Sequence, residues 1–121
     1  SYILLESDYN PKKFLNLMKK INSNKIGINY DTGNSAAQGY NFSNEKIYIK
    51  YIKNIHLKDR KFKGSSVPFG QGSTNFKRIF SILRKFNYKG YFSLQCARSQ
   101  TNDHIDEIFY NYSFLNKYNY V

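Results

Sequence analysis

Three apolar runs, each followed by a polar side chain at an even interval, place the strongest constraint on the fold. Glu6 follows the run 3–5, Asp31 follows the run 26–30, and His56 comes directly after 53–55. The step from Glu6 to Asp31 and the step from Asp31 to His56 are both 25 residues, about the length of one strand-loop-helix-loop unit. Successive units bring their strand ends to the same edge of a parallel sheet, so the pattern predicts three ligand-type side chains at one rim and hence a metal site.

Four such units account for the whole chain. We expect strands at 2–6, 26–31, 55–58 and 91–95, helices between and after them, and a long Gly- and Pro-containing loop over 59–74. Four βα units are half of an eight-unit barrel, which needs roughly 200 residues or more to close. Because Ser1 is not an initiator Met and a strand follows at once, we interpret residues 1–121 as a fragment of one barrel domain. Half a barrel exposes two strand edges, so it is expected to form a homo-oligomer or to be part of a larger molecule.

The net charge is +11, from 19 Lys and Arg against 8 Asp and Glu. Strongly basic domains often bind nucleic acid, but here the basic residues are distributed over the predicted helices rather than in one block. The chain is also rich in Asn and Tyr, so we favour genome-wide compositional drift over a dedicated nucleic-acid surface. Of the few acids, Glu6, Asp31 and Asp59 lie at or just beyond strand ends, where a role as a solvated surface charge is least expected.

Cys96 is the single cysteine, so an intrachain disulfide is impossible and a reducing cytoplasm is the default location. No apolar stretch approaches the roughly 18 residues of a membrane span. We therefore predict a cytoplasmic protein with no membrane partner.

Three spaced motifs carry a family resemblance: DTGNSAAQGY at 31–40, HLKDR at 56–60 and GQG at 70–72. In this order they resemble the second half of the xylose isomerase-like TIM barrels, specifically the sugar phosphate isomerase/epimerase family. The resemblance covers nearly the whole chain and corresponds to the last four βα units. It implies an α/β fold that is the second half of a (β/α)₈ TIM barrel, with the N-terminal half missing.

The resemblance also implies a ligand set for one divalent metal ion. It assigns this role to Glu6, Asp31, His56 and Gln95, and such oxygen-rich coordination suits Mn²⁺, Mg²⁺ or Co²⁺. In the family, the metal binds the carbonyl and hydroxyl of a sugar or sugar phosphate and stabilises an enediolate, while two glutamates exchange the carbon-bound proton. Those catalytic positions correspond here to Glu6 and Gln95.

Gln95 departs from this pattern, since an acid is expected where the fourth apolar run ends. Its amide oxygen can ligate a hard cation, but a neutral amide cannot act as a carboxylate base. Three interpretations remain open: Glu6 works alone with a water, the protein catalyses another metal-assisted step, or catalysis has been lost and a degenerate sugar-binding barrel remains.

A phosphodiesterase of the apurinic-endonuclease kind is the competing enzyme class, because those proteins share a similar aspartate turn. Asn34 stands where such nucleases place a histidine, which argues against their three-metal site. The predicted substrate-binding residues are Asn34, Lys58, Arg60 and Arg98. The two guanidinium groups are suited to holding a phosphate or carboxylate at two points.

Overall fold

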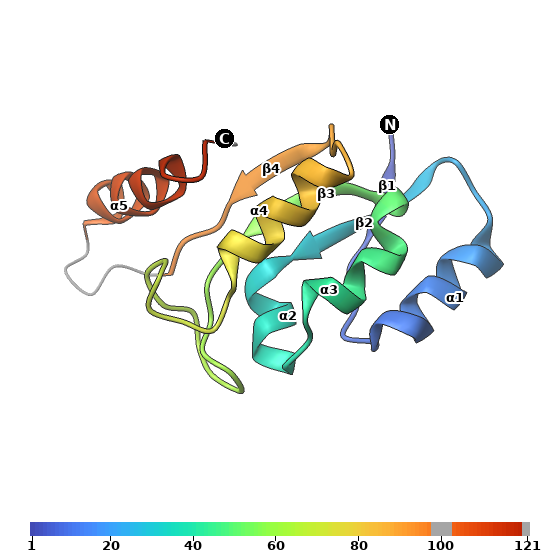
Figure 1. Ribbon diagram of the computed structural model, residues 1–121, viewed down its shortest axis with the longest axis horizontal. Coiled ribbons are helices and arrows are strands. Elements are labelled where there is room, and N and C mark those ends of the chain that lie inside the picture. Colours follow the sequence, from blue (N-terminus) through green and yellow to red (C-terminus); the bar gives the residue numbers. More distant parts are fainter. Residues whose placement is uncertain (98–102, 120–121) are drawn as a thin grey trace.

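Parallel strands in chain order build the sheet (Figure 1). The computed structural model describes residues 1–97 and 103–119. Its one four-stranded sheet has the order β1-β2-β3-β4, and every neighbouring pair is parallel. The strands are β1 (Ile3–Leu5), β2 (Ile26–Asp31), β3 (Ile52–Leu57) and β4 (Tyr91–Leu94). This arrangement confirms the predicted α/β class of four βα units.

Helices make the crossovers between these strands. Figure 1 shows α1, α3 and α4 lying over one face of the sheet. The helical elements are α1 (Pro11–Ile21), α2 (Thr32–Gln38), α3 (Phe42–Glu45), the 3₁₀ helix η1 (Lys46–Tyr51), α4 (Phe76–Lys85) and α5 (His104–Asn116). In the described part of the chain, none of them is long and apolar enough to cross a membrane.

Strand alternation divides the sheet into an apolar face and a polar face. Ile28, Tyr30, Ile55 and Leu57 are all at most 4% exposed and belong to the core that packs against the helices. Residues at alternate strand positions point to the opposite face. That second face carries Asn29, Asp31, Asn54 and His56.

A bulge between β2 and β3 sets which of these polar side chains are neighbours. Ile28 pairs with Ile52, whereas Asn29 pairs with Asn54, so one residue of β3 is passed over. Beyond the bulge, Asp31 pairs with His56. The irregularity therefore brings two predicted ligands side by side.

Two elements differ from the sequence-based expectation. The small-residue stretch after Asp31 forms the helix α2, because the Asp31 side chain caps it and Gly39 ends it in the left-handed conformation at φ 83°. Strand β3 begins at Ile52, three residues earlier than expected, because Ile52 is buried in the core and pairs with β2. Tertiary packing thus sets the residue at which this strand begins.

Apolar side chains are exposed along both outer strands. Ile3 on β1 is 64% exposed and Tyr91 on β4 is 79% exposed, and among the residues that the structure describes neither strand has a second neighbour in the sheet. Parallel sheets are normally covered on both faces and closed at their edges. This surface is what half of a barrel would leave open.

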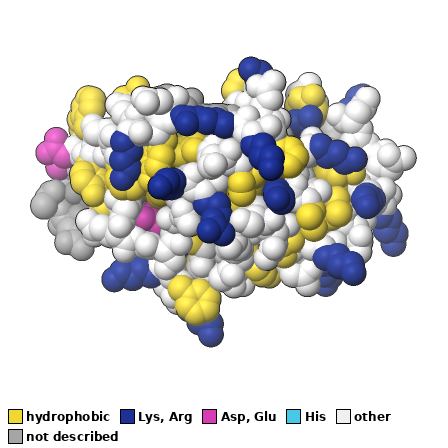
Figure 2. All heavy atoms as spheres, in the orientation of Figure 1, with side chains coloured by type: hydrophobic (Ala, Val, Ile, Leu, Met, Phe, Trp, Pro, Cys, Tyr) yellow, Lys and Arg dark blue, Asp and Glu magenta, His cyan; other side chains and the backbone are white. Residues whose placement is uncertain are grey.

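Basic side chains are spread over the helix-covered face (Figure 2). In that view the Lys and Arg side chains are separated by apolar and uncharged polar atoms and do not form one continuous patch. On this face the basic side chains are not gathered in one block, as expected from the sequence.

Candidate active site

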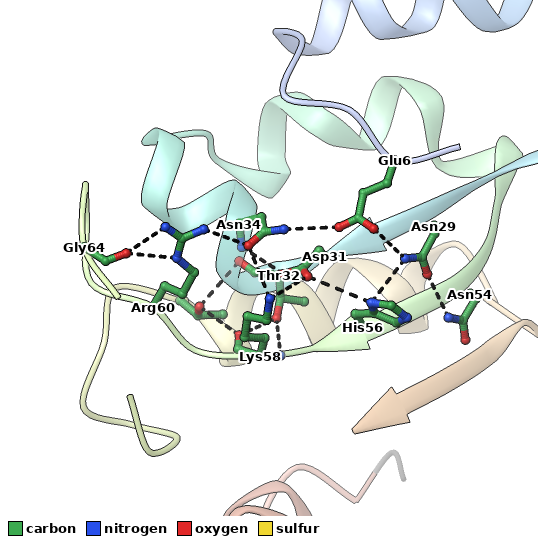
Figure 3. Close-up of polar contacts among 11 residues, drawn as sticks. Glu6, Asn29, Asp31, Thr32, Asn34, Asn54, His56, Lys58, Arg60 and Gly64 are labelled. Atoms are coloured by element: carbon green, nitrogen blue, oxygen red, sulfur yellow. Dashed lines mark hydrogen bonds and ion pairs between the residues drawn. The ribbon is translucent and has the colours of Figure 1, made fainter. Parts of the chain in front are cut away.

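Glu6, Asp31 and His56 meet at the carboxyl-terminal edge of the sheet (Figure 3). Glu6 directly follows β1, Asp31 is the last residue of β2, and His56 lies one residue before the end of β3. One ligand atom from each lies within 4.8 Å of the other two. Asp31 is buried, His56 is partly buried and Glu6 is exposed, so the cluster opens to solvent on the side of Glu6.

The two carboxylate oxygens of Asp31 have different partners. Oδ1 accepts the backbone N–H of Asn34 at 2.8 Å and so caps α2. Oδ2 faces the cluster, 3.2 Å from Lys58 Nζ and 3.9 Å from His56 Nδ1. One oxygen therefore holds the local fold while the other is directed toward the candidate site.

Two asparagines hold the Glu6 carboxylate. Asn29 donates through Nδ2 to Oε2 at 3.1 Å, and Asn34 donates through Nδ2 to Oε1 at 3.1 Å. Asn29 Nδ2 also lies 3.2 Å from His56 Nδ1. The sequence analysis missed Asn29, although its place two residues before Asp31 on one strand is a signal that both face the same side.

Lys58 and Arg60 both contact Asn34, and Lys58 also contacts Asp31 directly. Lys58 Nζ lies 3.4 Å from Asn34 Oδ1, and Arg60 Nη1 donates to the same oxygen at 2.8 Å. Arg60 also donates to the carbonyl of Gly64, through Nε at 2.9 Å and Nη2 at 2.8 Å. Because these donors already bind protein acceptors, Arg60 is placed to orient Asn34, and Lys58 is the cation nearer to Asp31.

Gln95 lies at the same edge but is less closely tied to the cluster. Its backbone N–H donates to the carbonyl of Leu57 at 3.0 Å, and its side chain is exposed. The register places Ser93, not Gln95, beside His56. The fourth predicted ligand, Gln95, therefore stays a prediction, and Arg98 lies outside the described residues.

A buried aspartate organises the long loop that borders the site. Asp59 is fully buried and accepts the backbone N–H groups of Gly70 at 2.9 Å, Gly72 at 3.0 Å and Thr74 at 3.1 Å. A Cβ on Gly72 would lie 2.2 Å from Asp59 Oδ1, so this position requires glycine. Asp59 thus anchors the loop whose first residues include Arg60 and Gly64.

A second buried carboxyl, Glu45, lies at the end of α3 and contacts α2 through Ser35. It accepts the hydroxyl of Tyr30 at 2.8 Å and that of Tyr48 at 3.1 Å, and the Ser35 hydroxyl as well. Glu45 is 2% exposed, and this burial raises the pKa of its carboxyl. The sequence analysis missed it, because a lone acid in a short helix resembles an ordinary surface residue.

This burial predicts a pH-dependent effect of Glu45→Gln. Because the pKa of Glu45 is higher in the folded state, the protonated carboxyl contributes to the free energy of unfolding. This contribution is fully present below the unfolded pKa of about 4.3 and is lost as pH rises through the folded pKa. The free energy of unfolding of Glu45→Gln, relative to the wild type, should therefore increase between about pH 4 and pH 7. Urea denaturation across this range measures it, with Asp8→Asn as the control for loss of an exposed carboxylate. A constant difference would contradict the prediction.

The donor set at the sheet edge fits a hard divalent cation. Two carboxylates and one imidazole are ligands that Mn²⁺ and similar cations accept. With bonds of about 2.0–2.2 Å, ligand atoms on one cation lie at most about 4.4 Å apart, so the 4.8 Å spread observed here would close with small side-chain rotations. Glu6, Asp31 and His56 are thus able to hold such an ion.

The family follows from a comparison with known proteins. The family model described as xylose isomerase-like TIM barrel matches residues 5–116. This chain belongs to that family. Among its curated relatives, the putative L-ribulose-5-phosphate 3-epimerase SgbU of Haemophilus influenzae is 35% identical over 96 residues, which cover 73% of this chain and 34% of that protein. The inosose dehydratase of Clostridium botulinum is 31% identical over 101 residues, covering 68% of this chain and 34% of that protein.

Solved structures of xylose isomerase-like barrels agree in fold. The xylose isomerase domain protein from Planctomyces limnophilus superposes with a TM-score of 0.80 at 18% identity, over 97% of this chain and 45% of that one. The present chain spans about a third of the length of the curated relatives that it matches. The fold and family predicted from the sequence are confirmed, and the relatives include enzymes named for epimerisation and for dehydration.

Proposed function

We propose that this chain carries the metal-binding and proton-transfer site of an isomerase or epimerase acting on a sugar or sugar phosphate. The observation that carries the proposal is the convergence of Glu6, Asp31 and His56 at the carboxyl-terminal edge of the sheet, the edge where barrels of this type place their active sites. The similarity to a sugar phosphate epimerase supports the substrate class.

Glu6, Asp31 and His56 would hold one divalent cation, Mn²⁺, Mg²⁺ or Co²⁺, with the amide oxygen of Gln95 as a further ligand. When bound, such a cation draws electron density from a carbonyl and its neighbouring hydroxyl, which lowers the pKa of the carbon-bound proton between them. The lysine Lys58, 3.2 Å from Asp31 Oδ2, is close enough to bind a substrate oxygen beside this site.

Glu6 is the proposed base. It is the exposed carboxylate of the cluster, so a substrate can approach it from solvent. Asn29 and Asn34 each donate to one of its oxygens. Both asparagines also limit its rotation, and Arg60 supports this by holding the oxygen of Asn34.

A dehydratase is the second candidate, and Gln95 is the observation that favours it. Epimerisation beside a ketone and loss of water from a hydroxyketone begin with the same step, the removal of a proton next to a carbonyl. Inversion then needs a group that returns a proton to the opposite face, which a neutral amide does not do. Elimination needs the hydroxyl to depart as water, and the proton taken up by Glu6 can be returned to that leaving hydroxyl. One of the curated relatives is an inosose dehydratase.

The open sheet edges support a further proposal about the complete molecule. Residues 1–121 would be the C-terminal half of one barrel domain, and the exposed strands β1 and β4 would be covered by further barrel strands or by a second copy. We also propose the cytoplasm as its location, which is compatible with a single cysteine.

Exchange of solvent deuterium into a ketose or ketose phosphate tests the proposed function. In the complete, Mn²⁺-loaded protein, Glu6→Gln should lower the exchange rate at least about 100-fold, because general-base catalysis typically contributes that much or more. Asp8→Asn removes a nearby exposed carboxylate outside the cluster and should leave exchange unchanged. Gln95→Glu should retain metal binding and increase epimer formation relative to loss of water.

Other outcomes point to the competing functions. Metal-dependent nicking of abasic DNA that falls steeply with salt would favour the nuclease alternative. Neither exchange, loss of water nor nicking across a panel of sugars would favour a degenerate barrel that only binds sugar. Exchange that survives in Glu6→Gln would remove Glu6 from the role of base.

A further inference from the structure

Uncharged polar side chains form a row beside the candidate site. Asn29, Asn54 and Ser93 each stand two residues before a rim residue, so each faces the same side of the sheet as that residue. Asn54 pairs in register with Asn29. The three residues therefore lie on the site-facing side of β2, β3 and β4 (Asn29 and Asn54 are drawn in Figure 3).

Their hydrogen bonds all run in one direction. Ser93 donates through Oγ to Asn54 Oδ1 at 3.2 Å, and Asn54 donates through Nδ2 to Asn29 Oδ1 at 2.7 Å. Asn29 then donates through Nδ2 to Glu6 Oε2 at 3.1 Å. The chain of bonds thus starts on β4 and ends on the residue that follows β1, crossing every strand.

This direction determines the orientation of the Asn29 amide. Its oxygen is engaged by Asn54, so its NH₂ group must face Glu6 and His56. The flipped amide would place its oxygen against the Glu6 carboxylate and its NH₂ against the NH₂ of Asn54, which pairs acceptor with acceptor and donor with donor. The Glu6 carboxylate, which only accepts, sets this direction, because a hydroxyl can donate or accept. Ser93 completes the row by donating to the Asn54 oxygen.

We propose that Ser93, Asn54 and Asn29 are positioning residues that hold Glu6 and His56 in the arrangement that binds the cation. The inference rests on the proposed function for the presence of a metal site. Glu6 needs this support because it follows an exposed outer strand of only three residues. Asn29 also orients the His56 ring with Nδ1 toward Asp31, 3.9 Å away.

The hydrogen bonds from Ser93 through Asn54 and Asn29 to Glu6, called the amide relay below, are compatible with an occupied site. A carboxylate oxygen has more than one lone pair, so Glu6 can keep the hydrogen bond from Asn29 while it binds a cation. His56 Nδ1 has a single lone pair, and a cation there would replace the contact with Asn29. The relay therefore positions Glu6 and His56 in the metal-free protein. When a cation binds, only the contact between Asn29 and His56 is lost.

Mn²⁺ titration of the protein without substrate tests the proposal at Ser93, the first donor of the row, which pairs in register with His56 on the neighbouring strand. Ser93→Ala removes a hydroxyl whose bond is to Asn54 and should weaken Mn²⁺ binding several-fold, while Asn54→Leu should weaken it about 10-fold or more. Ser93→Thr keeps the hydroxyl and should restore wild-type affinity. Ser81→Ala makes the same chemical change at an exposed position on α4 and should have no effect.

Two further readouts separate the possible failures. In ¹⁵N spectra of the metal-free protein, the Asn29 side-chain NH₂ signals should move in Ser93→Ala and return in Ser93→Thr. If Ser93→Ala and Asn54→Leu both bound Mn²⁺ with wild-type affinity, the proposal would be overturned. It would also be overturned if the free energy of Mn²⁺ binding and the free energy of unfolding of the metal-free protein fell by equal amounts. Weaker binding in these variants with no deuterium exchange in any protein would uphold the relay and defeat the proposed reaction. No Mn²⁺ binding by the wild type would overturn both.

Discussion

Replacing Asp31 with Asn should abolish the stabilisation of the protein by Mn²⁺. A cation that binds only the folded state stabilises it by about 2.7 kcal/mol when its free concentration is 100-fold above Kd, which raises Tm by several degrees in a domain of this size. Asp31 supplies the most buried ligand of the cluster, so without its charge this shift should disappear. Thermal unfolding with and without Mn²⁺ measures the effect.

Asn is the informative substitution because Asp31 has a second role. Its Oδ1 caps α2, and Asn caps a helix about as well as Asp. The metal-free Tm of Asp31→Asn should therefore remain closer to the wild type than that of Asp31→Ala. If Mn²⁺ still stabilised Asp31→Asn as much as the wild type, Asp31 would not be a ligand.

Replacing Asp59 with Ala should produce the largest loss of stability of any single change at the site. Three partly buried backbone N–H groups lose their acceptor at once, and a hydrogen bond to a charged group contributes about 1.5–3 kcal/mol. We expect the free energy of unfolding to fall by about 3 kcal/mol or more. Chemical denaturation measures this fall.

Two further variants, Asp59→Asn and Gly72→Ala, test whether the loop depends on the hydrogen bonds that Asp59 accepts. Asn keeps one acceptor oxygen but turns an NH₂ toward a backbone donor, so its effect should be intermediate. Gly72→Ala leaves the aspartate in place but forces a Cβ against its carboxylate, so it should also destabilise the loop. Asp8→Ala, at an exposed carboxylate, is the control, and an Asp59→Ala loss no greater than that of Asp8→Ala would show that the loop does not depend on this anchor.

The regular features of the sequence were sufficient for the strands, the main helices and three of the candidate ligands. Asn10 and Pro11 open α1, because the Asn10 side chain accepts the N–H of Lys13 and proline suits the first helical turn. Glu6, Asp31 and His56 were recognised because strand ends follow from local apolar runs, and parallel strand ends share one edge. These are short-range properties that a single chain displays in its residue order.

The missed residues have roles that depend on partners far away in the chain. Glu45 is buried only because Tyr30, Ser35 and Tyr48 surround it with hydroxyl donors. Helix α2 has no apolar periodicity, and it forms where an aspartate at a strand end caps it. Arg60, predicted to bind substrate, donates to Gly64 and Asn34, a geometry set by the folding of the loop.

The α/β class, the family and the side chains that reach one rim follow from the residue order, because spacing, alternation and motifs are local. How those side chains meet depends on the folded sheet. The bulge that passes over one residue of β3 pairs Asn29 with Asn54 and Asp31 with His56; a shift of one residue would turn each of these side chains to the other face. Strand register depends on the packing of the whole sheet against its helices, so the amide relay and the closeness of the three ligands could be read only from the folded chain.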